Sequence, residues 1–171
     1  MIDWDHIDTV LLDMDGTLLD LHYDNTLWNE LLPARYGAAH DLSEDAARTH
    51  LFSHMHQHYG TLTFYCLDHW AEFTGLDIVA LHEELVELVR YRPSAEHFLD
   101  WIRARGKRAL LVTNAHRDSL RVKNARAAVV DRLGELMELG FGQLVLFTHD
   151  RCSEQTLELL SAEVIPQLPR V

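Results

Sequence analysis

Basic residues are scarce in this sequence. Its 171 residues include 15 Lys and Arg against 27 Asp and Glu, which gives a formal net charge of −12 at pH 7. Such a chain repels the phosphate backbone of DNA and RNA, and no basic run interrupts its acidic character. We therefore expect no nucleic-acid partner, although small anions can bind where a metal ion or backbone dipoles supply positive charge.

Cysteine, glycine, proline and long apolar segments are scarce as well. The two cysteines, Cys66 and Cys152, are far apart in the sequence and predict free thiols in a reducing cytoplasm. No segment approaches the roughly 20 apolar residues of a membrane-spanning helix, and residues 1–8 lack the features of a signal peptide. The 8 glycines and 4 prolines are scattered and mark no linker. These absences predict a cytoplasmic protein without a membrane partner, built as one domain or a domain with an insertion.

Short apolar runs and helical periodicity predict an α/β fold. Runs rich in Val and Leu that do not alternate with polar residues are typical of buried parallel strands. The long region between the first two runs has apolar residues at helical spacing instead, for example over residues 78–89. The expected strands are Thr9–Leu12, Ala109–Val112 and Gln143–Phe147, and further helices are expected at Ser94–Arg105 (ending at Gly106), Ser119–Arg126, Asp131–Leu139 and from Ser153 to Pro166. The sequence thus predicts an α/β sandwich with a helical insertion after the first strand.

A pair of aspartates marks the end of the first predicted strand. The motif there is Asp13-Met14-Asp15-Gly16-Thr17-Leu18-Leu19-Asp20. Ligands of open α/β sheets bind beyond the carboxyl ends of strands, and residues two apart in extended chain face the same side. Two carboxylates so close favour a divalent cation between them, and oxygen ligands suit Mg²⁺. A solvated turn is the structural alternative, whereas glycine in fourth place does not fit a calcium-binding EF-hand loop.

This motif resembles the first motif of the haloacid dehalogenase-like hydrolase superfamily. The resemblance implies that Asp13 is the nucleophile that becomes an aspartyl-phosphate and that Asp15 is the general acid and base. It also implies Mg²⁺ as the cofactor, a Rossmann-like three-layer sandwich with a parallel sheet that is truncated here, and a hydrolase core formed by residues 1–20 and 94–171. Residues 21–93 then form the inserted helical cap, which covers the site and selects the substrate.

The second predicted strand leads into Thr113 and Asn114. The family's second motif is a strand that closes on Ser or Thr and binds the phosphoryl group, so the resemblance implies that Thr113 and Asn114 bind phosphate. Thr113 also suits the N-cap position just before a helix, where a hydroxyl accepts hydrogen bonds from free backbone N–H groups. Both roles are compatible with the sequence.

Several segments are similar to the bacterial GMP/IMP nucleotidases within the superfamily. They lie within residues 5–126 and are Val10–Leu21, Asp24 and Asn25, Trp28, Tyr65–Asp68, Trp70 and Leu111–His116. This similarity implies a small phosphomonoester as the partner, and a purine nucleoside monophosphate in particular. From Ala127 on the similarity ends, and Leu133–Leu168 resembles the end of luciferase-like flavin monooxygenases, which implies a fusion or a truncated reading frame.

Later motifs of the superfamily supply a lysine and a further acid. The chain has only Lys107 and Lys123, and Lys123 comes too early for the family's lysine motif, so a solvated helix residue is its simpler interpretation. Asp150 ends the third predicted strand and is the candidate for the third metal ligand beside Asp13 and Asp15. An ordinary acid at a strand end is the alternative for Asp150.

A dense group of histidines gives a rival hypothesis. His50, His54 and His58 are spaced four apart, which places them on one face of a helix, and His56 lies among them. Such spacing suits a transition metal, whereas a solvated helix face needs no ligand at all. The alternatives to an enzyme are therefore a His-rich metal-binding module without catalysis and an inactive remnant of the hydrolase.

Overall fold

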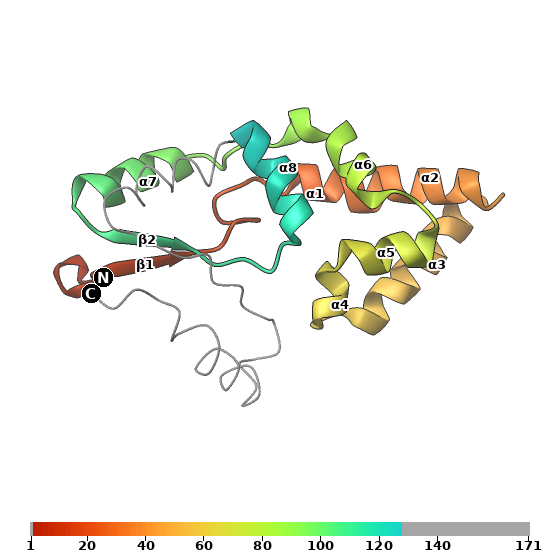
Figure 1. Ribbon diagram of the computed structural model, residues 1–171, viewed down its shortest axis with the longest axis horizontal. Helices are drawn as coiled ribbons and strands as arrows, with labels where there is room; N and C mark the ends of the chain where they lie inside the picture. Colours follow the sequence, from red (N-terminus) through yellow and green to blue (C-terminus); the bar gives the residue numbers. More distant parts are fainter. Residues whose placement is uncertain (1, 128–171) are drawn as a thin grey trace. The chain divides into compact units, whose positions relative to one another are not determined.

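The computed structural model describes residues 2–127 of the chain (Figure 1). Close contacts group these residues into two units. The first unit contains residues 2–20 and 91–114, and the second contains residues 21–90 and 115–126. None of the helices between residues 2 and 127 is long and apolar enough to cross a membrane.

The first unit is built on two parallel strands, β1 (Thr9–Leu12) and β2 (Arg108–Leu111). Leu12 pairs with Leu111, and the N–H of Val112 donates to the carbonyl of Leu12 at 2.7 Å, which continues the pairing past both strands. The prediction for β1 is confirmed, and β2 begins one residue earlier than predicted. A short 3-10 helix, η1 (Trp4–His6), precedes β1.

Helix α7 (Ala95–Ala104) leads into β2 and confirms the predicted helix before that strand (Figure 1). Its buried residues, Ala95, Leu99 and Ile102, recur at helical spacing. The helix ends at Ala104, and Gly106, which was predicted to stop it, follows two residues later with a φ of +61°. The N–H groups of Gly106 and Lys107 donate to carbonyls of the last helical turn at 2.9 and 3.2 Å, a pattern that closes the helix before the strand begins.

The second unit is helical, and residues 21–90 contain no strand, as the periodicity predicted. Ser43 and Asp77 begin two of its helices by accepting hydrogen bonds from Ala46 and Ala80 N–H groups. Its elements are α1 (His22–Thr26), the π-helix η2 (Leu27–Leu31), α2 (Leu32–Ala39), α3 (Glu44–His58), α4 (Leu62–Tyr65), α5 (Leu67–Thr74), α6 (Ile78–Glu84), the 3-10 helix η3 (Val86–Leu88) and α8 (Arg117–Ala127).

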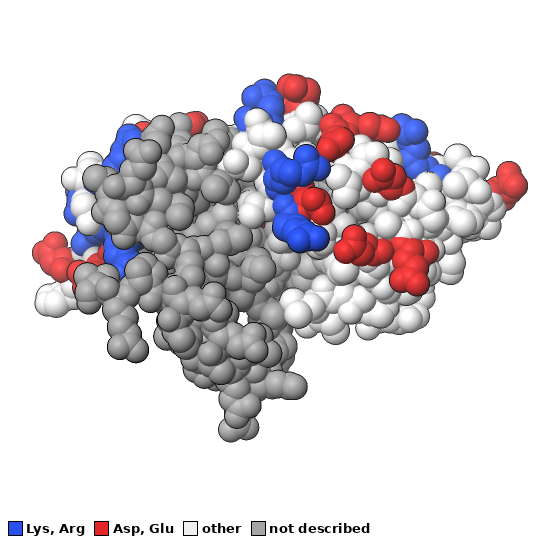
Figure 2. All heavy atoms as spheres, viewed as in Figure 1, with Lys and Arg blue, Asp and Glu red and all other residues white. Residues whose placement is uncertain are grey.

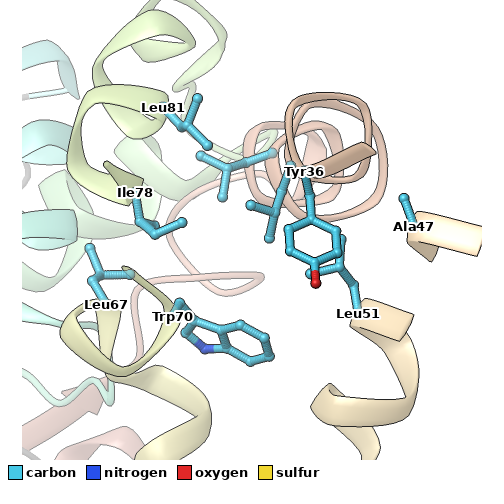
Figure 3. Packing of buried hydrophobic residues seen from close by; sticks show 9 residues of the cluster. Tyr36, Ala47, Leu51, Leu67, Trp70, Ile78 and Leu81 are labelled. Atoms are coloured by element: carbon cyan, nitrogen blue, oxygen red, sulfur yellow. The ribbon is translucent and has the colours of Figure 1, made fainter. Parts of the chain in front are cut away.

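A cluster of buried side chains holds the helical unit together (Figure 3). Tyr36 from α2, Leu51 from α3 and Trp70 from α5 converge there, and Trp70 is only 1% exposed. The full cluster comprises Leu27, Leu32, Tyr36, Ala47, Leu51, Leu67, Trp70, Ile78 and Leu81. Because apolar side chains of η2, α2, α3, α5 and α6 meet in it, this unit has a core of its own.

The segment 78–89 departs from the single helix that its periodicity predicts. Helix α6 ends at Glu84, and Leu85 has φ −101° and ψ 6°, after which η3 tightens into a 3-10 turn. Ile78 and Val89 are still buried, so the apolar spacing survives the break. The predicted strand at residues 143–147 and the predicted helices at residues 131–139 and 153–166 lie outside the described residues.

Candidate active site

The segment after β1 forms a compact turn. The carbonyl of Met14 accepts hydrogen bonds from the N–H groups of Leu18 (2.9 Å) and Leu19 (2.8 Å), and the N–H of Gly16 donates to the carbonyl of Leu19 (2.9 Å). Gly16 has a φ of +75°, a left-handed conformation that glycine adopts without strain. These bonds hold the motif in one conformation at the carboxyl end of β1.

Asp13 and Asp15 flank a completely buried residue in this turn. Met14 is 0% exposed, whereas Asp13 is exposed and Asp15 is half-buried. Oδ1 of Asp13 accepts a hydrogen bond of 2.7 Å from the N–H of Met14, which orients its carboxylate. The core-facing side chain of Met14 therefore separates two aspartates that remain accessible to a ligand.

Arg92 is a contact of this turn that the sequence did not reveal. Its guanidinium donates to the carbonyl of Gly16, and its backbone N–H donates to the carbonyl of Leu18 at 2.8 Å. Arg92 and Gly16 lie 76 positions apart in the chain. An isolated arginine outside any motif gives no indication of its partners in the sequence. Only the tertiary structure shows that Arg92 holds the turn by hydrogen bonds to its carbonyl groups.

Thr113 and Asn114 follow β2 at the same edge of the sheet. Because β1 and β2 are parallel and Leu12 pairs with Leu111, the residues that follow each strand leave the sheet together. Thr113 is 2% exposed, and Oδ1 of Asn114 is buried without a hydrogen-bond partner among the described residues. The helix-capping alternative for Thr113 does not hold, because α8 begins only at Arg117.

The donor atoms at this edge suit a hard divalent cation. Asp13 offers carboxylate oxygens, Asp15 offers its backbone carbonyl oxygen, and the unpartnered Oδ1 of Asn114 is a further oxygen. Mg²⁺ prefers oxygen ligands and retains waters, so this donor set fits it. Within residues 2–127, no third acid, histidine or cysteine joins the two aspartates in a metal-binding group. Asp150, the predicted third ligand, lies outside the described residues.

Lys123 lies in the helical unit and is not the solvated residue that the sequence predicted. It is 1% exposed, and its Nζ donates to Oδ1 of Asp24 at 2.7 Å. The ammonium also lies 5.2 Å from the centre of the Tyr23 ring. Helix α8 packs this lysine inward with Leu120 and Val122, which are also buried. The apolar residues Leu120 and Val122 just before Lys123 were the available signal in the sequence, whereas no sequence feature indicated its partner Asp24 on α1.

A second buried polar contact lies beside this ion pair. The Tyr23 hydroxyl donates to the carbonyl of His82 at 3.0 Å, and its oxygen lies 2.7 Å from Nδ1 of the same residue. Because the hydroxyl of Tyr23 has one proton and donates it to the carbonyl, the N–H at Nδ1 of His82 donates to the hydroxyl oxygen. Burial, with the nearby charges of Lys123 and His116, lowers the pKa of His82 to about 3. His82 is therefore a neutral core residue.

Contacts of the segment after Thr113 tie it into the helical unit. Nε2 of His116 lies 3.8 Å from a carboxylate oxygen of Asp68, and its Nδ1 accepts a hydrogen bond from the N–H of Asp118 at 3.3 Å. Farther along α8, Arg121 pairs with Glu83 at 3.2 Å. The chain thus runs directly from the predicted phosphate-binding residues into contacts with α5 and α6.

Three comparisons with known proteins bear on this arrangement. The family model described as haloacid dehalogenase-like hydrolase matches residues 7–158. The GMP/IMP nucleotidases YrfG of Escherichia coli (strain K12) and Shigella flexneri are each 43% identical over 122 residues, which are 71% of this chain and 55% of theirs. The chain thus spans about half the length of these curated relatives.

The comparison with solved structures concerns the fold. The crystal structure of the HAD phosphatase from Thermococcus onnurineus superposes with a TM-score of 0.66 at 20% identity, over 84% of this chain and 63% of that one. This similarity confirms the predicted Rossmann-like α/β class.

Proposed function

The chain belongs to the haloacid dehalogenase-like hydrolases, and from this membership we propose that it hydrolyses phosphomonoesters through an aspartyl-phosphate on Asp13. The turn Asp13–Leu19 carries the proposal. It holds two accessible aspartates at the carboxyl end of β1, and Thr113 and Asn114 follow the paired strand. Phosphoryl transfer needs a nucleophile, a proton donor and polar groups around the phosphoryl oxygens, and these residues are of the required types.

In the first half of the proposed reaction, a carboxylate oxygen of Asp13 attacks phosphorus. The new bond between that oxygen and phosphorus forms as the ester bond to the leaving alcohol breaks. Asp15, in its acid form, donates its proton to the departing alkoxide. Thr113 and the side-chain amide of Asn114 donate hydrogen bonds to the phosphoryl oxygens.

In the second half, water hydrolyses the aspartyl-phosphate. The Asp15 carboxylate accepts a proton from this water, whose oxygen attacks phosphorus and breaks the bond to Asp13. Inorganic phosphate leaves, and Asp15 is again in its acid form. The Asp13 carboxylate and the backbone carbonyl of Asp15 would hold Mg²⁺, with Asp150 as the proposed third ligand, and the ion would supply positive charge that offsets the negative charge of the phosphoryl group.

We assign substrate choice to the helical segment 21–93, which we propose is the cap. The relatives that are 43% identical are named GMP/IMP nucleotidases, and this supports a purine nucleoside monophosphate as the substrate. Closure of a cap excludes water during phosphoryl transfer and completes the site around the bound ester. Purine nucleotides and a reduced Cys66 are both compatible with a cytoplasmic location.

The test is phosphate release from GMP, IMP and p-nitrophenyl phosphate by the full chain, with Mg²⁺ and with EDTA. Asp13→Asn removes the nucleophilic charge while preserving the shape of the side chain. Asp8→Asn is the matched control, because Asp8 is also exposed but precedes β1 at the opposite end of the strand. We expect turnover that requires Mg²⁺ and Asp13 and is unchanged in Asp8→Asn.

Two outcomes would contradict the proposal. If a folded sample releases no phosphate from any of the three esters, the chain is the inactive remnant considered above. If Asp13→Asn retains turnover, another group is the nucleophile and the aspartyl-phosphate is excluded. A strong preference for the aryl phosphate over both nucleotides would overturn the substrate assignment alone.

A further inference from the structure

Three histidine side chains converge on the surface of the helical unit. His54 and His58 come from α3 and His69 comes from α5. One imidazole nitrogen of each lies within 4.8 Å of one nitrogen of each of the others, and all three side chains are half-buried. Nε2 of His54 and Nε2 of His69 are 2.9 Å apart. The centre of the His58 ring lies 4.6 Å from that of His54 and 4.8 Å from that of His69.

We propose that His54, His58 and His69 form a transition-metal site that is separate from the Mg²⁺ site and independent of the hydrolase reaction. Imidazole nitrogen suits Zn²⁺, Co²⁺, Ni²⁺ and Cu²⁺, whereas Mg²⁺ and Ca²⁺ prefer oxygen. Three protein ligands leave a fourth position for water or an external ligand.

The spacing of the nitrogens is close to that of a tetrahedral site. With metal–nitrogen bonds of about 2.0–2.1 Å, ligand nitrogens of a tetrahedral ion are about 3.3 Å apart. The His54 and His69 nitrogens need to separate by a few tenths of an ångström, and His58 needs to move closer by rotation of its side chain. The hydrogen bond between two imidazoles is then replaced by two bonds to the metal.

The surroundings of His54 restrict its ring and disfavour its charged form. The ring stacks on Phe73 with 3.6 Å between centres and an interplanar angle of 4°, and it meets the Trp70 ring edge-on at 5.4 Å. Burial and the neighbouring histidines lower the pKa of His54. A neutral imidazole held by aromatic neighbours loses little conformational freedom when it binds a metal, which favours binding.

The third ligand differs from the one that the sequence predicted. Helical spacing predicted His50 with His54 and His58, but Nδ1 of His50 lies 2.7 Å from the Tyr36 hydroxyl, and the ring centres of that pair are 5.7 Å apart. His69 joins His54 and His58 instead, from a different helix. A site that links α3 to α5 also predicts that metal binding stabilises the helical unit.

The test measures metal binding to the intact chain by calorimetric titration with Zn²⁺ and by the visible spectrum of Co²⁺. We expect one equivalent of Zn²⁺ and the absorption of tetrahedral Co²⁺. His54→Gln and His69→Gln should each weaken binding at least about tenfold, since even the loss of an outer-shell partner costs that much. His56→Gln is the matched control, because His56 is exposed on the same helix and outside the cluster.

Each variant's far-UV circular dichroism and thermal unfolding in metal-free buffer establish that it is folded. Zn²⁺ should raise the unfolding temperature of the native chain and of His56→Gln but not of His69→Gln. Binding that persists in His69→Gln and is lost in His50→Gln would show that the ligands are those of a single helix face. The absence of a stoichiometric site in the native chain would overturn the proposal, whether or not the chain hydrolyses phosphate esters.

Discussion

The ion pair of Lys123 and Asp24 is largely removed from water, with 2% and 19% of the two side chains exposed. Replacing only Lys123 removes the cation beside the Asp24 carboxylate, which is itself mostly shielded from water. Such losses are more costly than the pair itself is favourable, because the desolvation of the remaining charge is no longer offset. The ion pair therefore makes the stability of the helical unit sensitive to changes at either residue alone.

We predict that Lys123→Met lowers the free energy of unfolding by about 3 kcal/mol. Urea denaturation followed by circular dichroism measures this change. Arg121→Met on the same helix is the control, because its pair with Glu83 is exposed and should be worth less than about 1 kcal/mol. The double variant with Asp24→Asn should recover part of the loss, and equal losses in the two single variants of α8 would contradict the prediction.

His82 should make the stability of the chain depend on pH. Its pKa is about 3 in the folded protein and 6.5 in its ordinary state, so between these values the unfolded chain binds a proton that the folded chain does not. Stability contributed by His82 is thus complete above pH 6.5 and is lost as the pH falls toward 3, by at most about 1.4 kcal/mol per pH unit.

The pH effect is measured by comparison with His82→Asn, which keeps a donor for the Tyr23 hydroxyl but does not titrate. We expect urea denaturation to find the variant less stable at pH 7 and the difference to shrink steadily at pH 6, 5 and 4.5. Carboxylates that become protonated affect both proteins alike and cancel in the difference. If the free energy of unfolding of the two proteins changed equally with pH, His82 would be protonated in the folded protein as readily as in the unfolded chain, and the prediction would be wrong.

At the scale of elements, the end of α7 is fixed by a single backbone conformation. Gly106 has a φ of +61°, and a Cβ atom placed there meets no atom within 4 Å. Substitution therefore introduces backbone strain without a steric clash. We predict that Gly106→Ala costs about 1–2 kcal/mol in unfolding experiments.

Gly106→Asn tests the origin of that cost. Asparagine adopts the left-handed conformation more readily than alanine, so its loss of stability should be smaller. If asparagine and alanine are equally destabilising, the cost comes from the side chain's surroundings and not from φ. Thermal unfolding of the three proteins under one set of conditions decides between these causes.

Elements with local signals were predictable from the sequence. The apolar run of β1, the spacing in α7 and the glycine that ends α7 each act within a few residues, and the structure agrees with all three. The break at Leu85 was not predictable, because periodicity reports which side is buried and not whether the backbone hydrogen bonds are continuous. Local patterns therefore located β1, β2, α7 and α8 and missed the interruption at Leu85, whereas the individual helices between residues 22 and 74 were not placed in advance.

Contacts between distant segments were beyond the sequence. Asp13 and Asp15 follow β1, and Thr113 follows β2. These residues could be predicted as site residues because the carboxyl ends of neighbouring parallel strands lie at the same edge of the sheet. Arg92 at the motif turn and His69 in the histidine cluster have no pattern of their own, and each is identified only by a partner far away in the chain or on another helix. These contacts arise from tertiary packing and therefore could not be predicted from local sequence patterns.

At the scale of the whole molecule, the excess of acidic residues should itself influence stability. With 27 acidic against 15 basic side chains, even complete pairing leaves an excess of negative charge. Figure 2 shows Asp and Glu side chains spread over the drawn face of the described residues, with Lys and Arg among them. Mutual repulsion of the excess charge disfavours the compact state and is screened by salt.

We predict that raising NaCl from 10 to 150 mM at pH 7 increases the free energy of unfolding by on the order of 1 kcal/mol. The Debye length falls from about 30 to 8 Å over this range, so repulsion between charges far apart on the surface is lost while close ion pairs such as Arg35–Glu84, at 2.8 Å, are weakened less. The control is the same titration near pH 5.3, the isoelectric point of the sequence, where the net charge vanishes and the increase should disappear. A stability that falls with salt at pH 7 would mean that favourable ion pairs outweigh the repulsion of the excess acids.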